Sequence, residues 1–256
     1  MRFAILSIGF ELLIGRVVNT NSAFICSELA KRGHEVGREI TVGDELTAIS
    51  SELKHLIQEG FQNIITTGGL GPTFDDMTAE GVAMAFGLQV EENSLALQWI
   101  TDKYDAMKLP LTAERRKMCR LPVGAQPIYN SLGTAPGFLF ADGRLKVLAL
   151  PGVPAEMTAI FQKNLEQIFP SEGRMHEREI RITGLPESTL ATYTVKLMEK
   201  YPSIYIKTHP RSSEGKSEVL VHAYAMSGSD DVESQLDSLI TALRSSVEKL
   251  GGRVEE

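Results

Sequence analysis

The chain has 256 residues, of which 43% are hydrophobic and 23% charged, and its formal net charge is −7 at pH 7. This balance is typical of a folded globular protein, and the length favours one large domain followed by a small one. The acidic balance and the absence of a Lys/Arg run argue against a nucleic-acid partner. The two cysteines, Cys26 and Cys119, stand far apart in the sequence, which predicts no disulfide framework and favours a reducing, cytoplasmic compartment.

The first apolar segment of the chain is too short to be an export signal or a membrane span. Residues 3–8 form a continuous apolar run, which is typical of a strand covered on both faces. No apolar stretch approaches the ~20 residues that cross a bilayer. We therefore expect a buried first strand and no membrane partner.

Strand-like and helix-like segments alternate after this first strand. The spacing of apolar residues predicts helices over 21–32, 46–59 and 78–86, each followed by a glycine that ends it. Residues rich in β-branched side chains predict strands over 36–42 and 63–67. Alternation of this kind is typical of a mostly parallel sheet covered by helices.

The later part of the first domain contains a predicted hairpin, and a boundary follows it. Strands are expected over 137–141 and 146–150, joined by an Asp-Gly turn. Residues 170–173 are polar or favour turns, which predicts a division into domains 1–170 and 171–256. The second domain should contain a strand, a helix, two strands and a long final helix.

A glycine-rich loop follows the strand predicted over 63–67. Glycines let backbone N–H groups approach an oxyanion, and the dipole of the next helix favours the same negative charge. We expect a phosphate group to bind here, with Thr78 as the N-cap of the helix. The residues assigned to ligand binding in this loop are Thr67, Gly68, Gly69, Gly71, Pro72, Thr73 and Thr78.

Two neighbouring acids, Asp75 and Asp76, stand in this loop. Carboxylates beside a bound phosphate would repel it unless a divalent cation such as Mg²⁺ joined them. The alternative is that one aspartate caps the following helix and the other is solvated. The pair therefore suggests metal-assisted chemistry without establishing it.

Other polar loop residues are expected at the same edge of the sheet, where the carboxyl ends of parallel strands meet. Glu11, Asn19 and Asn21 follow the first strand, and either asparagine has the alternative role of a helix cap. Asp44 follows the second strand and has the same alternative for the helix from residue 46. The remaining residues assigned to ligand binding are Gly133, Thr134, Pro151 and Gly152.

Taken in order, these motifs resemble the amino-terminal domain of the CinA (competence/damage-inducible protein A) family, within the wider MoaB/Mog molybdopterin-binding fold. The segments that carry the resemblance are 9–15, 19–21, 42–44, 66–78, 133–137 and 151–154. The resemblance covers nearly the whole chain. It implies a three-layer α/β/α MoaB/Mog-like domain with a mostly parallel sheet, a small C-terminal α+β domain, and a homo-oligomer.

The resemblance also implies a metal-dependent pyrophosphatase that hydrolyses ADP-ribose or a related nucleotide diphosphate, with Asp44 and Asp76 at its catalytic centre. We expect Glu11, Asp75 and Asp76 to hold the divalent ion, Mg²⁺, Mn²⁺ or Co²⁺, and a monovalent cation is a further candidate. Two alternatives stay open. One is a module that binds molybdopterin or a nucleotide without hydrolysis, and the other is a pterin adenylyltransferase of molybdenum cofactor biosynthesis.

Two aromatic residues depart from the pattern of the family. Phe10 stands where a small or polar residue is expected, and Phe74 replaces a polar residue in the acidic loop. Either ring could stack on an adenine or a pterin. Packing inside the protein is the interpretation that we favour for both.

Overall fold

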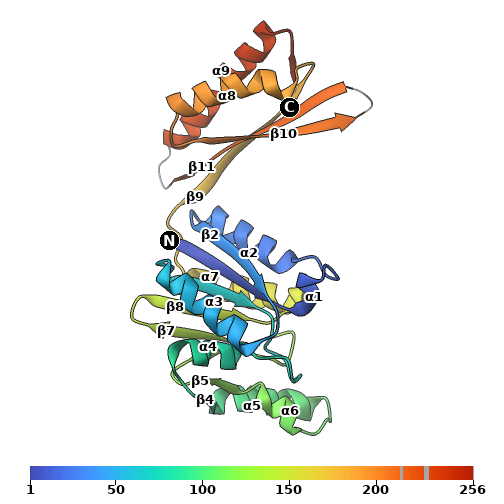
Figure 1. Ribbon diagram of the computed structural model, residues 1–256, viewed down its shortest axis with the longest axis vertical. Helices are drawn as coiled ribbons and strands as arrows, with labels where there is room; N and C mark the ends of the chain where they lie inside the picture. The colour runs from blue at the N-terminus through green and yellow to red at the C-terminus, as the bar shows by residue number, and fades with distance from the viewer. Residues whose placement is uncertain (214–215, 228–230, 256) are drawn as a thin grey trace. The chain divides into compact units, whose positions relative to one another are not determined.

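The computed structural model describes residues 1–213, 216–227 and 231–255 (Figure 1). The chain divides into two compact units: Met1–Leu29 with Glu35–Pro170, and Ala30–His34 with Ser171–Glu256. Each unit has hydrophobic core residues of its own. No helix within the described ranges is long and apolar enough to cross a membrane.

A six-stranded sheet forms the centre of the first unit, in the order β2-β1-β3-β8-β7-β6. The strands β2, β1, β3 and β8 are parallel, and β7 and β6 are antiparallel to their neighbours. The sheet is therefore mostly parallel, as predicted. Its strands are β1 (Arg2–Ile8), β2 (Glu35–Val42), β3 (Asn63–Thr67), β6 (Gln126–Ile128), β7 (Gly137–Asp142) and β8 (Leu145–Leu150).

Helices cover both faces of this sheet (Figure 1). Side chains of β1 alternate between the two cores: Phe3 and Ile5 pack with α2 and α7, whereas Leu6 packs with α3 and α4. The predicted three-layer α/β/α arrangement is thus confirmed. The covering helices are α2 (Thr20–Lys31), α3 (Leu46–Gln58), α4 (Thr78–Phe86) and α7 (Pro154–Ile168).

Short elements of this unit were not predicted, because three or four residues give no periodic signal. They are α1 (Phe10–Leu13), β4 (Val90–Glu92), β5 (Arg120–Pro122) and β6. The strands β4 and β5 form a two-stranded sheet beside α5 (Ser94–Ala106) and α6 (Ala113–Lys117). The side chain of Asn93 caps α5, and that of Thr112 caps α6.

The second unit is an α+β domain with a four-stranded antiparallel sheet in the order β10-β11-β9-β12. Its elements are β9 (Arg174–Thr183), α8 (Glu187–Lys200), β10 (Tyr205–Ser213), β11 (Lys216–Ser227), α9 (Asp231–Lys249) and β12 (Arg253–Glu255). The apolar stripe of α9 is buried, as its spacing predicted. The last strand, β12, was not predicted, because it is short and polar.

The packing of α4 on α3 depends on a glycine, and this yields a first prediction. A Cβ atom on Gly81 would lie 2.4 Å from Cγ2 of Ile49 and 2.8 Å from its Cβ. We expect Gly81→Ala to lower the free energy of unfolding by about 1–2 kcal/mol, since overpacking outweighs the better helix propensity of alanine. Urea unfolding measures the change. Met84→Ala, at a 43% exposed position of the same helix, is the control and should have a smaller effect.

Candidate functional site

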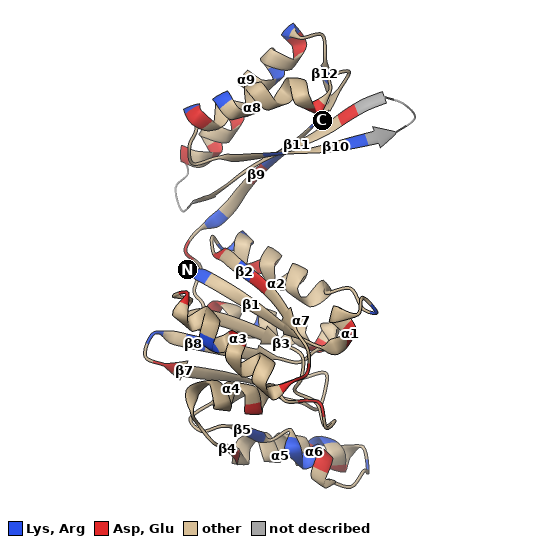
Figure 2. Cartoon of the chain, in the orientation of Figure 1, with Lys and Arg blue, Asp and Glu red and all other residues tan. Residues whose placement is uncertain are grey.

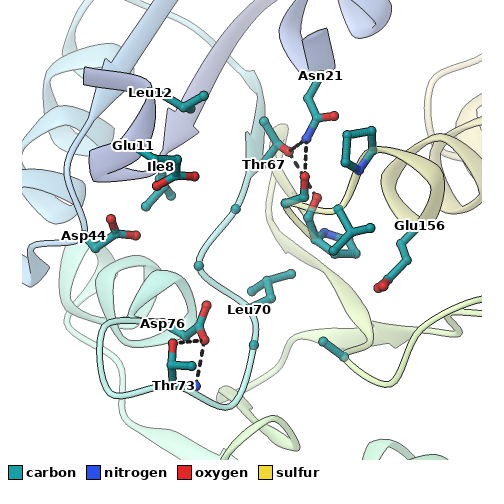
Figure 3. Close-up of a pocket in the computed structure, with 18 of the residues that line it drawn as sticks. Ile8, Glu11, Leu12, Asn21, Asp44, Thr67, Leu70, Thr73, Asp76 and Glu156 are labelled. Atoms are coloured by element: carbon teal, nitrogen blue, oxygen red, sulfur yellow. Dashed lines mark hydrogen bonds between the residues drawn. The ribbon is translucent and has the colours of Figure 1, made fainter. Parts of the chain in front are cut away.

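A cavity of about 440 Å³ opens at the carboxyl ends of β1, β3 and β8 (Figure 3). The chain passes from β1 outward to β2 and then returns to the other side of β1 as β3. Such a reversal of strand order separates the loops that follow the two central strands and leaves a crevice between them. The fold thus places the predicted ligand-binding loops around one pocket.

The loop after β3 passes very close to the end of β1. Gly68 has a φ of 103°, and a Cβ there would lie 2.1 Å from the carbonyl oxygen of Ile8. The Gly68 N–H donates to the carbonyl of Leu150 over 3.0 Å. Only glycine combines this positive φ with so close an approach. The loop is therefore anchored to both neighbouring strands.

Three backbone N–H groups of this loop have no hydrogen-bond partner among the residues that the structure describes. They belong to Gly69, Leu70 and Gly71, which all line the pocket. The helix α4 begins a few residues later, and no side chain caps its N-terminus. Unpaired N–H groups beside a helix N-terminus are the features that bind phosphate and other oxyanions.

The prediction for Thr78 is wrong. Its side chain is fully buried and does not line the pocket, and the N-cap of α4 is Met77. The Thr78 hydroxyl donates to the Gly68 carbonyl over 2.7 Å, while the Thr78 N–H donates to the carbonyl of Gly69 over 3.0 Å. Thr78 therefore holds the glycine loop from behind and is not placed to touch a ligand.

The two asparagines after β1 have different roles. Asn19 accepts the Ser22 N–H over 3.2 Å and so caps α2, as one alternative predicted. Asn21 donates to the Thr67 hydroxyl over 2.9 Å and to the Gly152 carbonyl over 2.8 Å. It joins the loops after β1, β3 and β8, and both asparagines line the pocket.

Carboxylates gather on one wall of the pocket. Asp44 accepts the Phe10 N–H over 2.7 Å, so it does not cap α3, whose N-cap is Glu45. Burial raises the pKa of the Asp44 carboxyl above its ordinary value, and the charges of Glu11 and Asp75 raise it further, against the opposing effect of the Phe10 N–H. Figure 3 shows Glu11 close to Asp44.

The acids of the glycine loop are organised by Thr73. Asp76 accepts the Thr73 N–H over 2.8 Å and lies 2.6 Å from the Thr73 hydroxyl. The same hydroxyl also bonds Asp75, which lowers the pKa of that carboxyl. Neither aspartate caps α4. Both line the pocket, and the catalytic assignment of Asp76 stays a prediction.

The acids fit one mode of metal binding and not another. Within residues 1–213, 216–227 and 231–255 no three His, Cys, Asp or Glu side chains cluster closely enough to hold a metal by themselves. The predicted set Glu11, Asp75 and Asp76 is thus not a preformed cage. Mg²⁺, however, is commonly bound by one or two carboxylates together with phosphate oxygens of a substrate. The acidic wall provides carboxylate donors for that arrangement.

Two lysines that the sequence analysis missed hold the pocket loops. Lys117 ends α6, whose last turn is basic (Figure 2), and donates to the carbonyls of Thr73 over 2.8 Å and Asp76 over 2.5 Å. Lys103 of α5 bonds the carbonyls of Asn130 and Gly133. Lys117 lies in a short polar helix and Lys103 lies in a helix with buried apolar residues, and at either position a lysine has the same sequence signature as a solvated surface residue.

The segment 130–135 lies beside the start of α7, because Asn130 contacts Glu156, and two of its residues line the cavity. Thr134 lines the pocket as predicted, whereas Gly133 does not. A third unpredicted residue, Glu156, lines the cavity from the first turn of α7. Its place in the Pro151–Glu156 segment, directly after a strand, is a signal that sequence analysis could have used. Pro72, Pro151 and Gly152 also line the pocket.

The interpretation of the two unusual aromatic residues as packing residues is wrong. Phe10 is 60% exposed and Phe74 is 85% exposed. Neither side chain lines the cavity. Phe10 is a surface residue of α1, and Phe74 is a surface residue of the loop after β3.

The fold and the site define a class of α/β ligand-binding domain: a mostly parallel sheet covered by helices on both faces, with a cavity at its topological switch point. Residues 4–170 match the family described as "Probable molybdopterin binding domain". The chain belongs to this family, and the predicted resemblance is confirmed at the level of family and fold.

Several known proteins are similar to this chain. A protein of Aeropyrum pernix is 41% identical over 258 residues, covering 98% of this chain and 96% of its own, and a protein of Pyrobaculum arsenaticum is 38% identical over 250 residues, covering 94% of each. The solved structure of the protein CinA from Thermoplasma acidophilum is 40% identical with a TM-score of 0.62, and it covers 66% of this chain and 98% of its own. The chain is thus CinA-like.

The close approach of Gly68 to Ile8 yields a second prediction. Gly68→Ala should displace the glycine loop, because its Cβ has no space, and should weaken phosphate binding at least tenfold. Calorimetric titration with inorganic pyrophosphate measures the affinity. Gly60→Ala is the matched control: Gly60 also has a positive φ, of 88°, but nothing lies within 4 Å of its Cβ position and it is outside the pocket. Equal loss of affinity in both variants would contradict the prediction.

Proposed function

We propose that the protein hydrolyses the pyrophosphate bond of ADP-ribose or a related nucleotide diphosphate with the help of a divalent cation. The observation that supports this most is the presence of three unpaired N–H groups, of Gly69, Leu70 and Gly71, in the same cavity as the Asp44 carboxylate. The first feature binds a phosphate, and the second can accept a proton.

In the proposed reaction the loop amides bind one phosphate and fix the position of the other. A water molecule attacks that second phosphorus, a new P–O bond forms, and the bond to the bridging oxygen breaks. Asp44 accepts the proton of the water, and AMP and ribose phosphate are the products. Because burial and neighbouring acids raise the pKa of Asp44, its carboxylate is a stronger base than an exposed aspartate.

The cation is part of the proposal and would be bound together with the substrate. Glu11, Asp75 and Asp76 are the carboxylates that would hold it, and all three line the cavity. When bound, Mg²⁺, Mn²⁺ or Co²⁺ would neutralise charge on the phosphate oxygens. This neutralisation would also relieve the repulsion between the acidic wall and the substrate.

A second candidate function has the support of the family description, which names molybdopterin binding. The same cavity would then receive the phosphate of a pterin, either without reaction or with transfer of an adenylyl group from ATP. The loop amides would serve hydrolysis, binding and adenylyl transfer equally. A base beside the phosphate favours hydrolysis over binding alone, because binding alone does not need a base.

The experiment that tests these functions supplies each substrate separately. Purified protein is incubated with ADP-ribose, or with ATP and molybdopterin, in the presence of Mg²⁺, Mn²⁺ or Co²⁺. Chromatography then detects AMP and ribose phosphate, or an adenylylated pterin. Release of AMP from ADP-ribose is the expected result, and adenylylation or binding without turnover would reject the proposed hydrolysis.

Asp44→Asn provides a sharper test of the proposed base. Asparagine keeps an oxygen that accepts the Phe10 N–H but cannot take up a proton, so we expect the rate of AMP release to fall about 10²–10⁴-fold. Steady-state assays measure the rate. Glu45→Gln, at the adjacent exposed position outside the cavity, is the control and should retain full activity.

The same variant should be more stable than the wild type at neutral pH. The raised pKa of Asp44 means that the folded protein disfavours the ionised carboxyl, so ionisation lowers stability above the folded pKa. The stability gain of Asp44→Asn should disappear as the pH falls below the ordinary aspartate value of about 4. Thermal unfolding between pH 3.5 and 8 measures it, and a gain that is constant with pH would contradict the assignment.

A further inference from the structure

Glu156 is the acid of the cavity that the proposed reaction leaves without a role. It projects from the first turn of α7 and lines the same cavity as the glycine loop. Figure 3 shows it across the glycine loop from Glu11 and Asp44, with its carboxylate turned away from α7. It is therefore separate from the acidic wall on which the base lies.

The carboxylate of Glu156 is held in place by Asn130. Asn130 is 1% exposed and donates to Oε2 of Glu156 over 2.6 Å and to the Ala135 carbonyl over 2.9 Å. Its own Oδ1 accepts the N–H groups of Leu132 over 3.1 Å and Gly133 over 2.8 Å. With four hydrogen bonds made, the amide of Asn130 cannot turn away from Glu156.

A missing side chain leaves the space for this carboxylate. A Cβ atom on Gly133 would lie 1.9 Å from Oε2 of Glu156, so any side chain at this position would displace the carboxylate from where it lies. Gly133 thus serves the pocket without lining it. The position of the carboxylate is built into the loop.

No salt bridge to Glu156 is formed within the described residues. The ammonium of Lys103 bonds the carbonyls of Asn130 and Gly133 and acts on Glu156 only through its charge, without a direct contact between the two side chains. Oε1 of Glu156 has no hydrogen-bond partner in the described part of the chain. Unpaired acceptors at a cavity are the groups that a donor-bearing ligand satisfies.

We propose that Glu156 is a specificity-determining residue that accepts hydrogen bonds from a pair of neighbouring donors on the part of the ligand remote from the bound phosphate. A carboxylate repels phosphate and attracts hydroxyl and amino groups, so it also directs the phosphate toward the glycine loop. Two ligand groups have the required chemistry: the vicinal diol of a ribose, and the amino group and ring N–H of a pterin. The inference rests on the proposed phosphate site but not on hydrolysis.

The test compares ligands that differ only in these donors. Calorimetry measures binding of AMP and of 2′,3′-dideoxy-AMP, and in a second arm of pterin and of lumazine, which lacks the amino group. Neither pair contains a pyrophosphate, so binding is measured without turnover. The wild type should prefer the donor-bearing member of one pair by roughly 10- to 100-fold, and the pair that shows this preference identifies the source of the donors.

The variant Glu156→Gln should reduce this preference toward one while binding the analogue that lacks the diol or the amino group about as tightly as the wild type does. Glu166→Gln, on the same helix but outside the cavity, is the matched control and should keep the full preference. A purely structural role of Glu156 would weaken both members of a pair equally. Unfolding curves of each variant show that it is folded before binding is compared.

Three results would overturn the inference: an unchanged preference in Glu156→Gln, equal weakening of both analogues, or failure of AMP and pterin alike to bind the wild type. Loss of the preference in a protein that releases no AMP from ADP-ribose would reject the proposed hydrolysis and leave the role of Glu156 standing. The two proposals can thus fail independently.

Discussion

The approach of Gly68 to the carbonyl of Ile8 is the constraint on which the candidate site depends. A Cβ at this position would lie 2.1 Å from that oxygen, so the chain can leave β3 in this direction only where the side chain is absent. The turn places the next three residues at the carboxyl end of the sheet, where their N–H groups have no partner among the described residues. A local property of one residue thereby determines where the proposed anion site lies.

Two lysines from α5 and α6 hold the glycine loop and the segment 130–135 in place. Lys117 and Lys103 each bond two backbone carbonyls, one pair in the acidic loop and one pair in the segment 130–135. An ammonium group that donates hydrogen bonds to carbonyl oxygens fixes a loop and leaves the backbone N–H groups of that loop free for a ligand. Neither lysine lines the cavity. The helices α5 and α6 thus hold two of the loops around the cavity from outside it.

Much of the fold could be predicted from the sequence because it follows local patterns. The buried strands β1 and β3 appear as apolar runs, and the long helices appear as apolar stripes ended by glycine. The N-cap role of Asn19 was among the alternatives for the same reason. Strands of three residues, such as β4 and β12, form because they pair with β5 and β9, and the local sequence does not predict this pairing.

The site was predicted less completely because its hydrogen bonds join residues far apart in the chain. The bond between Phe10 and Asp44 spans 34 positions, and that between Asn21 and Gly152 spans 131. Thr78 is a residue type that is common at N-caps, yet its hydroxyl donates to the carbonyl of Gly68, ten residues earlier. The place of Glu156 after a strand was a usable signal, but its contact with Asn130 and the space left for it by Gly133 become visible only in the folded chain.

If main-chain groups bind the phosphate, as we propose, the cavity has two parts with different freedom to change. An amide N–H is the same whatever side chain it carries, so substitutions at Leu70 that preserve the loop conformation leave the anion contacts intact. The opposite half consists of side chains on α7 and its preceding loops, where one replacement alters the chemistry offered to a ligand. New substrates could therefore be acquired through the α7 side alone, with the anion-binding half inherited unchanged.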